Sequence, residues 1–280
     1  MSTDATPFVW NGMTQAALDA AYNNMAAVSD SAERVASWTA RSAELRARHG
    51  AELDIAYGPK PRNRFDVFRC GRPDAPLVVF IHGGWWQRNS KEVFSCVAEG
   101  PLALGLDAAL IGYTLAPEAT LSEIAREVRG ALDAIAAYQA HHDRPTEIIL
   151  SGWSAGGHLT ALTMDHPAVA AGLSISGIFD LEPIRHSYIN DKLRLTETEV
   201  TELGPQHRQL TSKRLVVAFG LAELPEMQRQ SVAYHARGNI AGRPVVSLPL
   251  AGRDHFSIIE DLIRPEGELA KACRQLSMRS

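Results

Sequence analysis

IILSGWSAGGHLTAL, residues 148–162, combines an apolar run, a serine between glycines and the start of a helical pattern. The run 148–151 is typical of a buried strand, and 158–162 has the composition of a helix. Small residues around Ser154 allow a sharp turn between strand and helix that exposes the serine Oγ, and the helix N-terminus behind it favours developing negative charge. The GxSxG pattern alone is common, but this placement makes it informative. We therefore predict that Ser154 is a nucleophile.

Outward from this stretch, short β-rich runs alternate with helical ones. The expected strands are 53–57, 65–69, 77–81, 108–112, 148–151, 173–176, 215–219 and 245–250, and the expected helices are 14–28, 31–48, 121–139 and 225–237, with Asp30 or Ser31 able to cap the second helix. Near-continuous apolar strands separated by helices indicate a mostly parallel sheet that is covered on both faces. The predicted fold is α/β with two antiparallel strands at its start.

No repeat, low-complexity tract or linker divides the chain, so we expect a single domain over residues 1–280. The segment 179–213 interrupts the alternation because it is polar and irregular between two predicted strands. Long insertions at the carboxyl edge of a parallel sheet usually serve function. We expect this one to form a lid or a wall of the substrate pocket, the alternative being a surface excursion.

The HGGWW stretch, residues 82–86, follows the predicted strand 77–81. Consecutive glycines let backbone N–H groups turn into a pocket, which residues with a Cβ would hinder. Together with the N–H of Ala155, the Gly83 and Gly84 amides are candidates for an oxyanion hole. A tight turn that merely needs glycine is the alternative.

His255 is the candidate general base, because it follows the last predicted strand and completes the order serine, acid, histidine. We interpret His158 and His82 as structural and expect most of the other histidines to be solvated. The acid should follow the strand 215–219, where Glu223 is the first choice, Glu226 the second, and Asp180, after the preceding strand, the third. Asp254 adjoins His255, but neighbouring side chains on an extended loop tend to point apart.

Over nearly its whole length the chain resembles the kynurenine formamidase (arylformamidase) branch of the α/β-hydrolases, which is close to esterases of the hormone-sensitive-lipase type. The resemblance rests on LDAAYNN (18–24), Tyr57-Gly58, HGGWW, GWSAGGH (152–158), NDKLRL (190–195), PEMQRQS (225–231) and DHF (254–256). In that family the acid lies two positions before the PEFxRQS-like stretch, which corresponds to Glu223. The family usually has Asp there, and Met227 stands where an aromatic residue is common.

The resemblance implies an α/β-hydrolase fold and a serine hydrolase that cleaves N-formyl arylamines such as N-formyl-L-kynurenine through an acyl-enzyme. A short-chain or aryl carboxylesterase and a pathway-specific amidase remain alternatives, because pocket shape decides the substrate. Aromatic walls from Trp85, Trp86 and Trp153 would suit an aryl substrate, although indoles can also pack beneath a site. A non-catalytic binding protein of the same fold commonly lacks a triad member, whereas all three are present here.

Composition and charge restrict the remaining classes. With 28 Lys+Arg against 32 Asp+Glu, the net charge of −4 is spread along the chain, which is unlike a nucleic-acid binder. The N-terminus lacks the basic and apolar regions of a signal peptide and no apolar run could span a bilayer, so we expect a cytoplasmic protein without a membrane partner.

The three cysteines, Cys70, Cys96 and Cys273, are widely spaced, and neither CxxC nor HExxH occurs. We therefore expect free, structural cysteines, no metal and no cofactor. The expected partner is a small amide or ester substrate, and homo-oligomerisation remains open.

Overall fold

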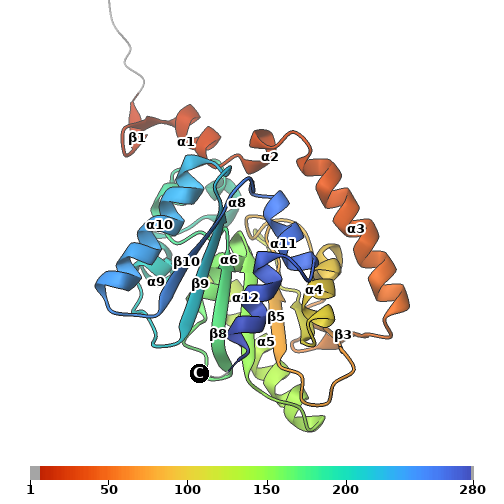
Figure 1. Ribbon diagram of the computed structural model, residues 1–280. Helices are drawn as coiled ribbons and strands as arrows, with labels where there is room; N and C mark the ends of the chain where they lie inside the picture. The colour runs from red at the N-terminus through yellow and green to blue at the C-terminus, as the bar shows by residue number, and fades with distance from the viewer. Residues whose placement is uncertain (1–6, 279–280) are drawn as a thin grey trace, which may run out of the picture.

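An eight-stranded sheet with strand order β10-β9-β8-β7-β5-β6-β4-β3 lies at the centre of the computed structural model, which describes residues 7–278 (Figure 1). Its strands are β3 (Glu52–Ala56), β4 (Arg64–Phe68), β5 (Leu77–Ile81), β6 (Asp107–Ile111), β7 (Ile148–Trp153), β8 (Val169–Ile175), β9 (Arg214–Gly220) and β10 (Val245–Leu250). Strands β5 to β10 pair in parallel, whereas β3 and β4 are antiparallel. The prediction of a mostly parallel α/β sheet with two antiparallel strands at its start is confirmed.

The strands agree closely with the sequence prediction, except that β8 begins at Val169 rather than at residue 173. A separate small sheet, formed by β1 (Phe8–Trp10) and β2 (Met13–Thr14), was not predicted. Residues 1–6, on which part of the expectation about an export signal rests, lie outside the described residues.

The helices between the strands are α1 (Gln15–Ala21), α2 (Asn24–Ala27), α3 (Ser31–Arg48), α4 (Glu99–Ala103), α5 (Leu121–His141), α6 (Ala155–Leu162), α7 (Glu182–Arg185), α8 (Asn190–Leu193), α9 (Glu197–Leu203), α10 (Pro225–Ile240), α11 (Glu260–Ile263) and α12 (Glu268–Leu276). Short 3-10 helices are η1 (Lys91–Ala98), η2 (Pro205–His207) and η3 (Ser257–Ile259).

The helix expected over 14–28 is interrupted at Tyr22 and Asn23. Thr14 caps α1, and the Asn23 side chain accepts a hydrogen bond from the N–H of Ala26, so that it caps a new helix, α2. Asp30 holds the N-cap position of α3 but makes no capping hydrogen bond, because its carboxylate pairs with Arg34.

Each face of the sheet carries its own apolar core. One core includes residues of α1, α5, α6, α9 and α10, and the other includes residues of α3, η1, α11 and α12. Both faces of the central strands are therefore buried, which explains why β5 and β6 read as uninterrupted apolar runs.

The segment 179–213 is more regular than its polar sequence indicated. It forms α7, α8, α9 and η2. A capping box between Thr196 and Glu199 starts α9, and Ile184, Leu193 and Val200 are buried in the core. The expectation of an irregular segment is wrong because local capping and three apolar anchors are enough to order these short helices.

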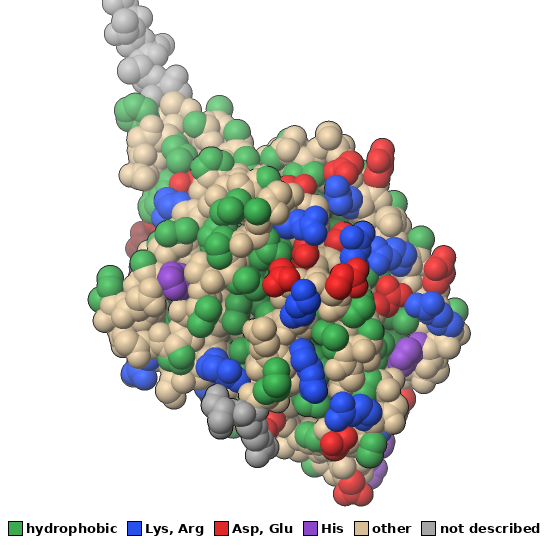
Figure 2. Space-filling view, in the orientation of Figure 1, with side chains coloured by type: hydrophobic (Ala, Val, Ile, Leu, Met, Phe, Trp, Pro, Cys, Tyr) green, Lys and Arg blue, Asp and Glu red, His purple; other side chains and the backbone are tan. Residues whose placement is uncertain are grey.

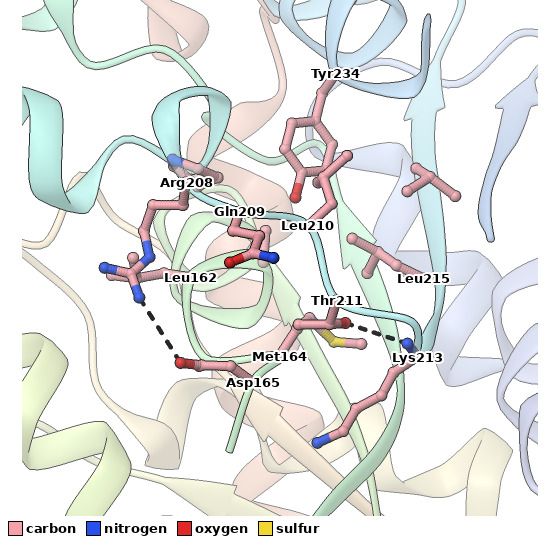
Figure 3. A pocket seen from close by; sticks show the side chains of 13 residues that line it. Leu162, Met164, Asp165, Arg208, Gln209, Leu210, Thr211, Lys213, Leu215 and Tyr234 are labelled. Atoms are coloured by element: carbon pink, nitrogen blue, oxygen red, sulfur yellow. Dashed lines mark hydrogen bonds and ion pairs between the residues drawn. The ribbon is translucent and has the colours of Figure 1, made fainter. Parts of the chain in front are cut away.

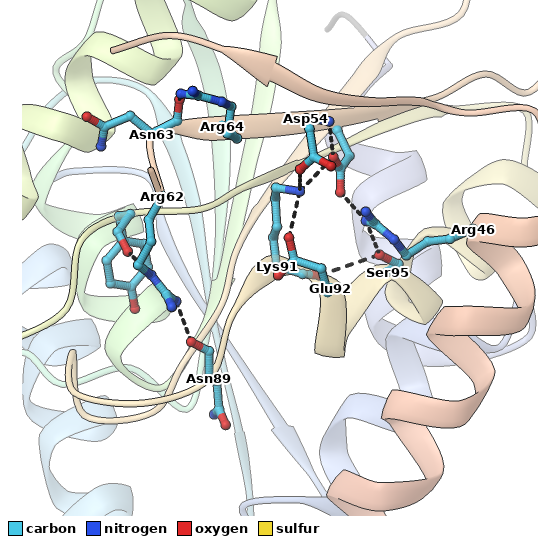
Figure 4. Close-up of polar contacts among 11 residues, drawn as sticks. Arg46, Asp54, Arg62, Asn63, Arg64, Asn89, Lys91, Glu92 and Ser95 are labelled. Carbon is cyan, nitrogen blue, oxygen red and sulfur yellow. Dashed lines mark hydrogen bonds and ion pairs between the residues drawn. The ribbon is translucent and has the colours of Figure 1, made fainter. Parts of the chain in front are cut away.

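A cluster of charged side chains around the buried Lys91 and Asp66 joins α3, β3, β4 and η1 (Figure 4). The Lys91 ammonium, on a side chain that is 3% exposed, lies 2.6 Å from Asp54 and 2.8 Å from both Asp66 and Glu92. Arg46 of α3 also pairs with Asp66. Because this cluster fixes Lys91 at the start of η1, it also anchors the segment that connects the HGGWW loop to η1.

Acidic and basic side chains alternate over the face that carries α3 and α11, without a broad region of one sign (Figure 2). Within residues 7–278, none of the helices combines the length and apolar character that crossing a membrane requires.

Candidate active site

Ser154 lies on the sharp turn between β7 and α6. Its backbone has φ 58° and ψ −117°, and a positive φ is a conformation that non-glycine residues rarely adopt. The flanking glycines are required by close approach: a Cβ on Gly152 would lie 2.3 Å from the Gly156 carbonyl oxygen, and one on Gly156 would lie 1.9 Å from that of Ile81. The GxSxG pattern is therefore a packing requirement of this turn.

The structure brings Ser154, His255 and Glu223 into one chain of hydrogen bonds. His255 Nε2 lies 3.1 Å from Ser154 Oγ, and His255 Nδ1 lies 3.0 Å from Glu223 Oε2. All three residues are at most 5% exposed. Since a carboxylate only accepts, Nδ1 carries the proton and Nε2 is free to accept one from the serine hydroxyl.

Two further groups orient the Glu223 carboxylate. Its Oε1 atom accepts hydrogen bonds from Ser176 Oγ at 2.7 Å and from the Gly220 N–H at 2.6 Å. Ser176 follows β8, and sequence reasoning missed it because nothing in the chain marks a serine in that position as a partner of a distant acid. Its side chain has no exposed surface, so this contact is dry.

The other candidate acids have different partners. Glu226 accepts from Tyr22 Oη and from the guanidinium of Arg229. Asp180 accepts from the N–H of Glu182, and burial raises the pKa of its carboxyl.

Asp254, the neighbour of His255, accepts from the N–H groups of Phe256 and Ser257 and so closes the turn that follows it. Among these four carboxylates, only that of Glu223 is hydrogen-bonded to His255.

The HGGWW loop lies directly against the serine. A Cβ on Gly83 would lie 2.6 Å from the Trp153 carbonyl oxygen and 3.0 Å from Ser154 Cβ. The Gly83 carbonyl accepts from His82 Nδ1 at 2.9 Å and from Asn89 Nδ2 at 3.2 Å. In a trans peptide the next N–H points the opposite way, so the Gly84 N–H faces away from these two donors. The Ala155 N–H begins α6 and has no acceptor within that helix.

His82 and His158 are structural, as expected. Burial lowers the pKa of each imidazole to about 4, which keeps both rings neutral near pH 7. His82 also stacks on Tyr113, with ring centroids 4.3 Å apart, and His158 donates from Nε2 to the Leu203 carbonyl.

A cavity of about 280 Å³ opens beside Ser154 and His255. Its other lining residues are Asn24, Met25, Ala32, Val35, Gly84, Trp85, Arg88, Asn89, Trp153 and Phe256. Trp153 also donates from Nε1 to the His255 carbonyl at 2.8 Å, so it both borders the cavity and supports the histidine.

Trp86 does not line this cavity, so the expectation that placed it in the pocket is wrong. Its side chain is fully buried, and its ring meets that of His158 edge to face at 4.9 Å. Trp85 and Trp86 both belong to the apolar core, but only Trp85 also borders the cavity.

No residue of 179–213 lines this cavity either, although we expected that segment to form a wall. The walls come from the N-terminal helices and the HGGWW loop instead. The segment borders a different, narrow cavity of about 40 Å³ between α6, β9 and α10, where Arg208 faces Asp165 at 3.7 Å (Figure 3).

Within residues 7–278, no group of three or more His, Cys, Asp or Glu side chains is arranged to hold a metal ion. All three cysteines are free, and burial raises the pKa of the Cys96 and Cys273 thiols to about 11 and about 12. Both thiols are therefore protonated near pH 7 and poorly nucleophilic.

Comparison with known proteins places the chain in a family. The sequence family BD-FAE matches residues 69–246. Kynurenine formamidase from Danio rerio is 30% identical over 227 residues, which cover 75% of this chain and 76% of that protein. Kynurenine formamidase from Salmo salar is 30% identical over 245 residues, which cover 81% of this chain and 82% of that protein.

The chain is an arylformamidase-like α/β-hydrolase of the BD-FAE family. Solved structures of other proteins resemble this arylformamidase-like chain. A Silicibacter sp. protein with the provisional name thioesterase superposes with a TM-score of 0.84 at 29% identity, covering 92% of this chain and 98% of that one. An esterase from Pyrobaculum calidifontis, with a TM-score of 0.73 at 18% identity over 90% of this chain and 94% of that one, shares the fold. The resemblance expected from the sequence is confirmed, and the protein is a hydrolase.

Proposed function

We propose that this chain is a serine hydrolase that cleaves the formamide bond of N-formyl arylamines, with N-formyl-L-kynurenine as its substrate. The observation that carries the proposal is the hydrogen-bonded series Glu223, His255, Ser154 at the edge of a cavity bordered by Trp85 and Trp153. The relatives named kynurenine formamidase support the choice of substrate.

In the first half-reaction, Ser154 Oγ attacks the formyl carbon while His255 Nε2 takes the hydroxyl proton. The negative charge of Glu223 stabilises the imidazolium and holds its Nδ1–H toward the carboxylate. The proton then passes from Nε2 to the nitrogen of the leaving arylamine, and the C–N bond breaks. The product bound to Ser154 is a formyl ester.

The oxyanion of the tetrahedral intermediate needs N–H donors, and we assign this role to Gly83, Gly84 and Ala155. The fixed Gly83 carbonyl supports the assignment, because it turns the Gly84 N–H away from His82 and Asn89. Removing one such donor typically lowers turnover about 10²–10³-fold.

In the second half-reaction, water attacks the formyl ester and gives its proton to His255 Nε2. The proton returns to Ser154 Oγ as formate leaves. No cofactor takes part in these steps.

The test compares kcat/KM for N-formyl-L-kynurenine with that for a short-chain p-nitrophenyl ester. We expect at least about 10⁴ M⁻¹s⁻¹ on the formamide, within the usual range for natural substrates. Turnover of the ester without turnover of the formamide would retain the serine hydrolase and replace the substrate by an ester.

A further inference from the structure

Asn24 is a polar side chain buried at the active-site cavity. The residue is 3% exposed, and neither its Oδ1 nor its Nδ2 atom has a hydrogen-bond partner among the described residues. It lines the same cavity as Ser154 and His255. Burying an amide unpaired costs its desolvation free energy, so a ligand that pairs with it gains binding energy.

The position of Asn24 is fixed by contacts of the residues just before it. Tyr22 Oη donates to Glu226 Oε2 at 2.9 Å and accepts from Gln230 Nε2 at 3.0 Å. The Tyr22 ring also meets Trp85 edge to face at 6.1 Å. Asn24 is thus held at the cavity by residues of α10 and the HGGWW loop, which favours a binding role over an adaptable surface position.

Arg88 supplies a positive charge to the same cavity. Its side chain is exposed and makes no hydrogen bond or ion pair within residues 7–278, while its backbone N–H is bonded to the Gly84 carbonyl. No Asp or Glu is among the residues that line the cavity. An unpaired guanidinium in a site without carboxylates favours an anionic group on the ligand.

We infer that Asn24 and Arg88 bind the amino-acid group of an aryl substrate, a refinement that rests on the proposed function. Arg88 pairs with the carboxylate, and the Asn24 amide, which has one acceptor and two donors, accepts from the ammonium and donates to the carboxylate. These residues determine specificity and take no part in bond cleavage.

The test uses two formamides that differ only in this group, N-formyl-L-kynurenine and 2-formamidoacetophenone. In Arg88→Met and in Asn24→Leu, which keeps the branched shape of the side chain but removes its polar atoms, kcat/KM for the first substrate should fall about 10- to 100-fold, mainly through KM. The value for 2-formamidoacetophenone should stay within about twofold, because this substrate has no amino-acid group for Asn24 and Arg88 to bind. Arg126→Met, an exposed arginine outside the cavity, is the matched control.

Parallel losses on both substrates would mean a structural role, and unchanged kinetics on both would mean no role; either result overturns the inference. The binding of L-kynurenine and of 2-aminoacetophenone to Ser154→Ala, measured by calorimetry, separates this outcome from a failure of the proposed reaction. If formamides are not hydrolysed, but L-kynurenine binds more tightly than 2-aminoacetophenone and this difference disappears when Arg88→Met is added, only the proposed reaction is wrong. If both compounds bind equally, the inference is wrong whatever the reaction.

Discussion

Glu223 Oε2 lies 3.0 Å from Nδ1 of His255, and this contact distinguishes the two glutamates that follow β9. Glu226, three positions further on, turns to Tyr22 and Arg229. One carboxylate thus meets the imidazole, while the other ties α10 to the N-terminal helices.

Exchanging each glutamate for glutamine should separate these roles. Glu223→Gln keeps the shape but removes the charge and favours the wrong tautomer of His255, so kcat should fall about 10³–10⁴-fold. Glu226→Gln should lower stability and keep most of kcat. Steady-state kinetics with urea unfolding of both variants checks this, and equal kcat losses would contradict the assignment of the acid.

Ser176→Ala should slow catalysis without touching the nucleophile. Loss of the 2.7 Å hydrogen bond frees the Glu223 carboxylate, and since hydrogen bonds to charged groups contribute about 1.5–3 kcal/mol, we expect kcat to fall at least about tenfold. Ser42→Ala is the control, because that buried hydroxyl donates to the Val93 carbonyl, away from the triad. A Ser176→Ala variant with wild-type kcat would show that the Gly220 N–H alone orients the acid.

Ser154 should be the residue that a fluorophosphonate modifies. Because the proposed mechanism uses His255 as the base, labelling should appear in the wild type, disappear in Ser154→Ala and become much slower in His255→Ala. Intact-protein mass spectrometry with peptide mapping is the measurement. An adduct on any other residue, or none on folded protein, would contradict the nucleophile.

The buried histidines should make the fold sensitive to mild acid. The pKa of His158 is about 4 in the folded protein against an ordinary value of 6.5, so the unfolded chain binds more protons between these values and stability falls as pH drops from 6.5 toward 4. At pH 5 the loss should be about 2 kcal/mol for each such histidine.

Urea unfolding at pH 7 and pH 5 checks this pH dependence. In His158→Gln the decrease should be smaller than in the wild type, whereas the exposed His141 should be replaceable by Gln without effect. The same decrease in all three proteins would show that other groups cause it.

Much of this arrangement could be predicted from the chain alone. The order of Ser154, Glu223 and His255 and the apolar strands were sufficient for the fold and for a ranked triad, because local pattern and chain order carry both. The sequence ranked Glu223 ahead of Glu226, but it could not show that Glu226 pairs elsewhere, since that depends on which way each side chain points near the start of α10.

Contacts between distant segments were also beyond sequence reasoning. Trp85 and Trp86 are adjacent and equally apolar, yet only one faces the cavity. Asn24 reaches the site through the contact between Tyr22 and Glu226, which are 204 positions apart. The segment 179–213 was expected at the pocket, but its place is taken by helices from the opposite end of the chain.

The contact between Tyr22 and Glu226 also bears on how such enzymes diversify. Ser154, Glu223 and His255 all follow strands of the sheet, whereas Asn24, Met25, Ala32 and Val35 belong to the chain before β3. A recombination crossover just ahead of Glu52 would therefore exchange one wall of the cavity as a unit. The new N-terminal segment would need a tyrosine that can form the same hydrogen bond to Glu226. Substrate range can then diverge between descendants of one gene while the bond-breaking apparatus is inherited intact.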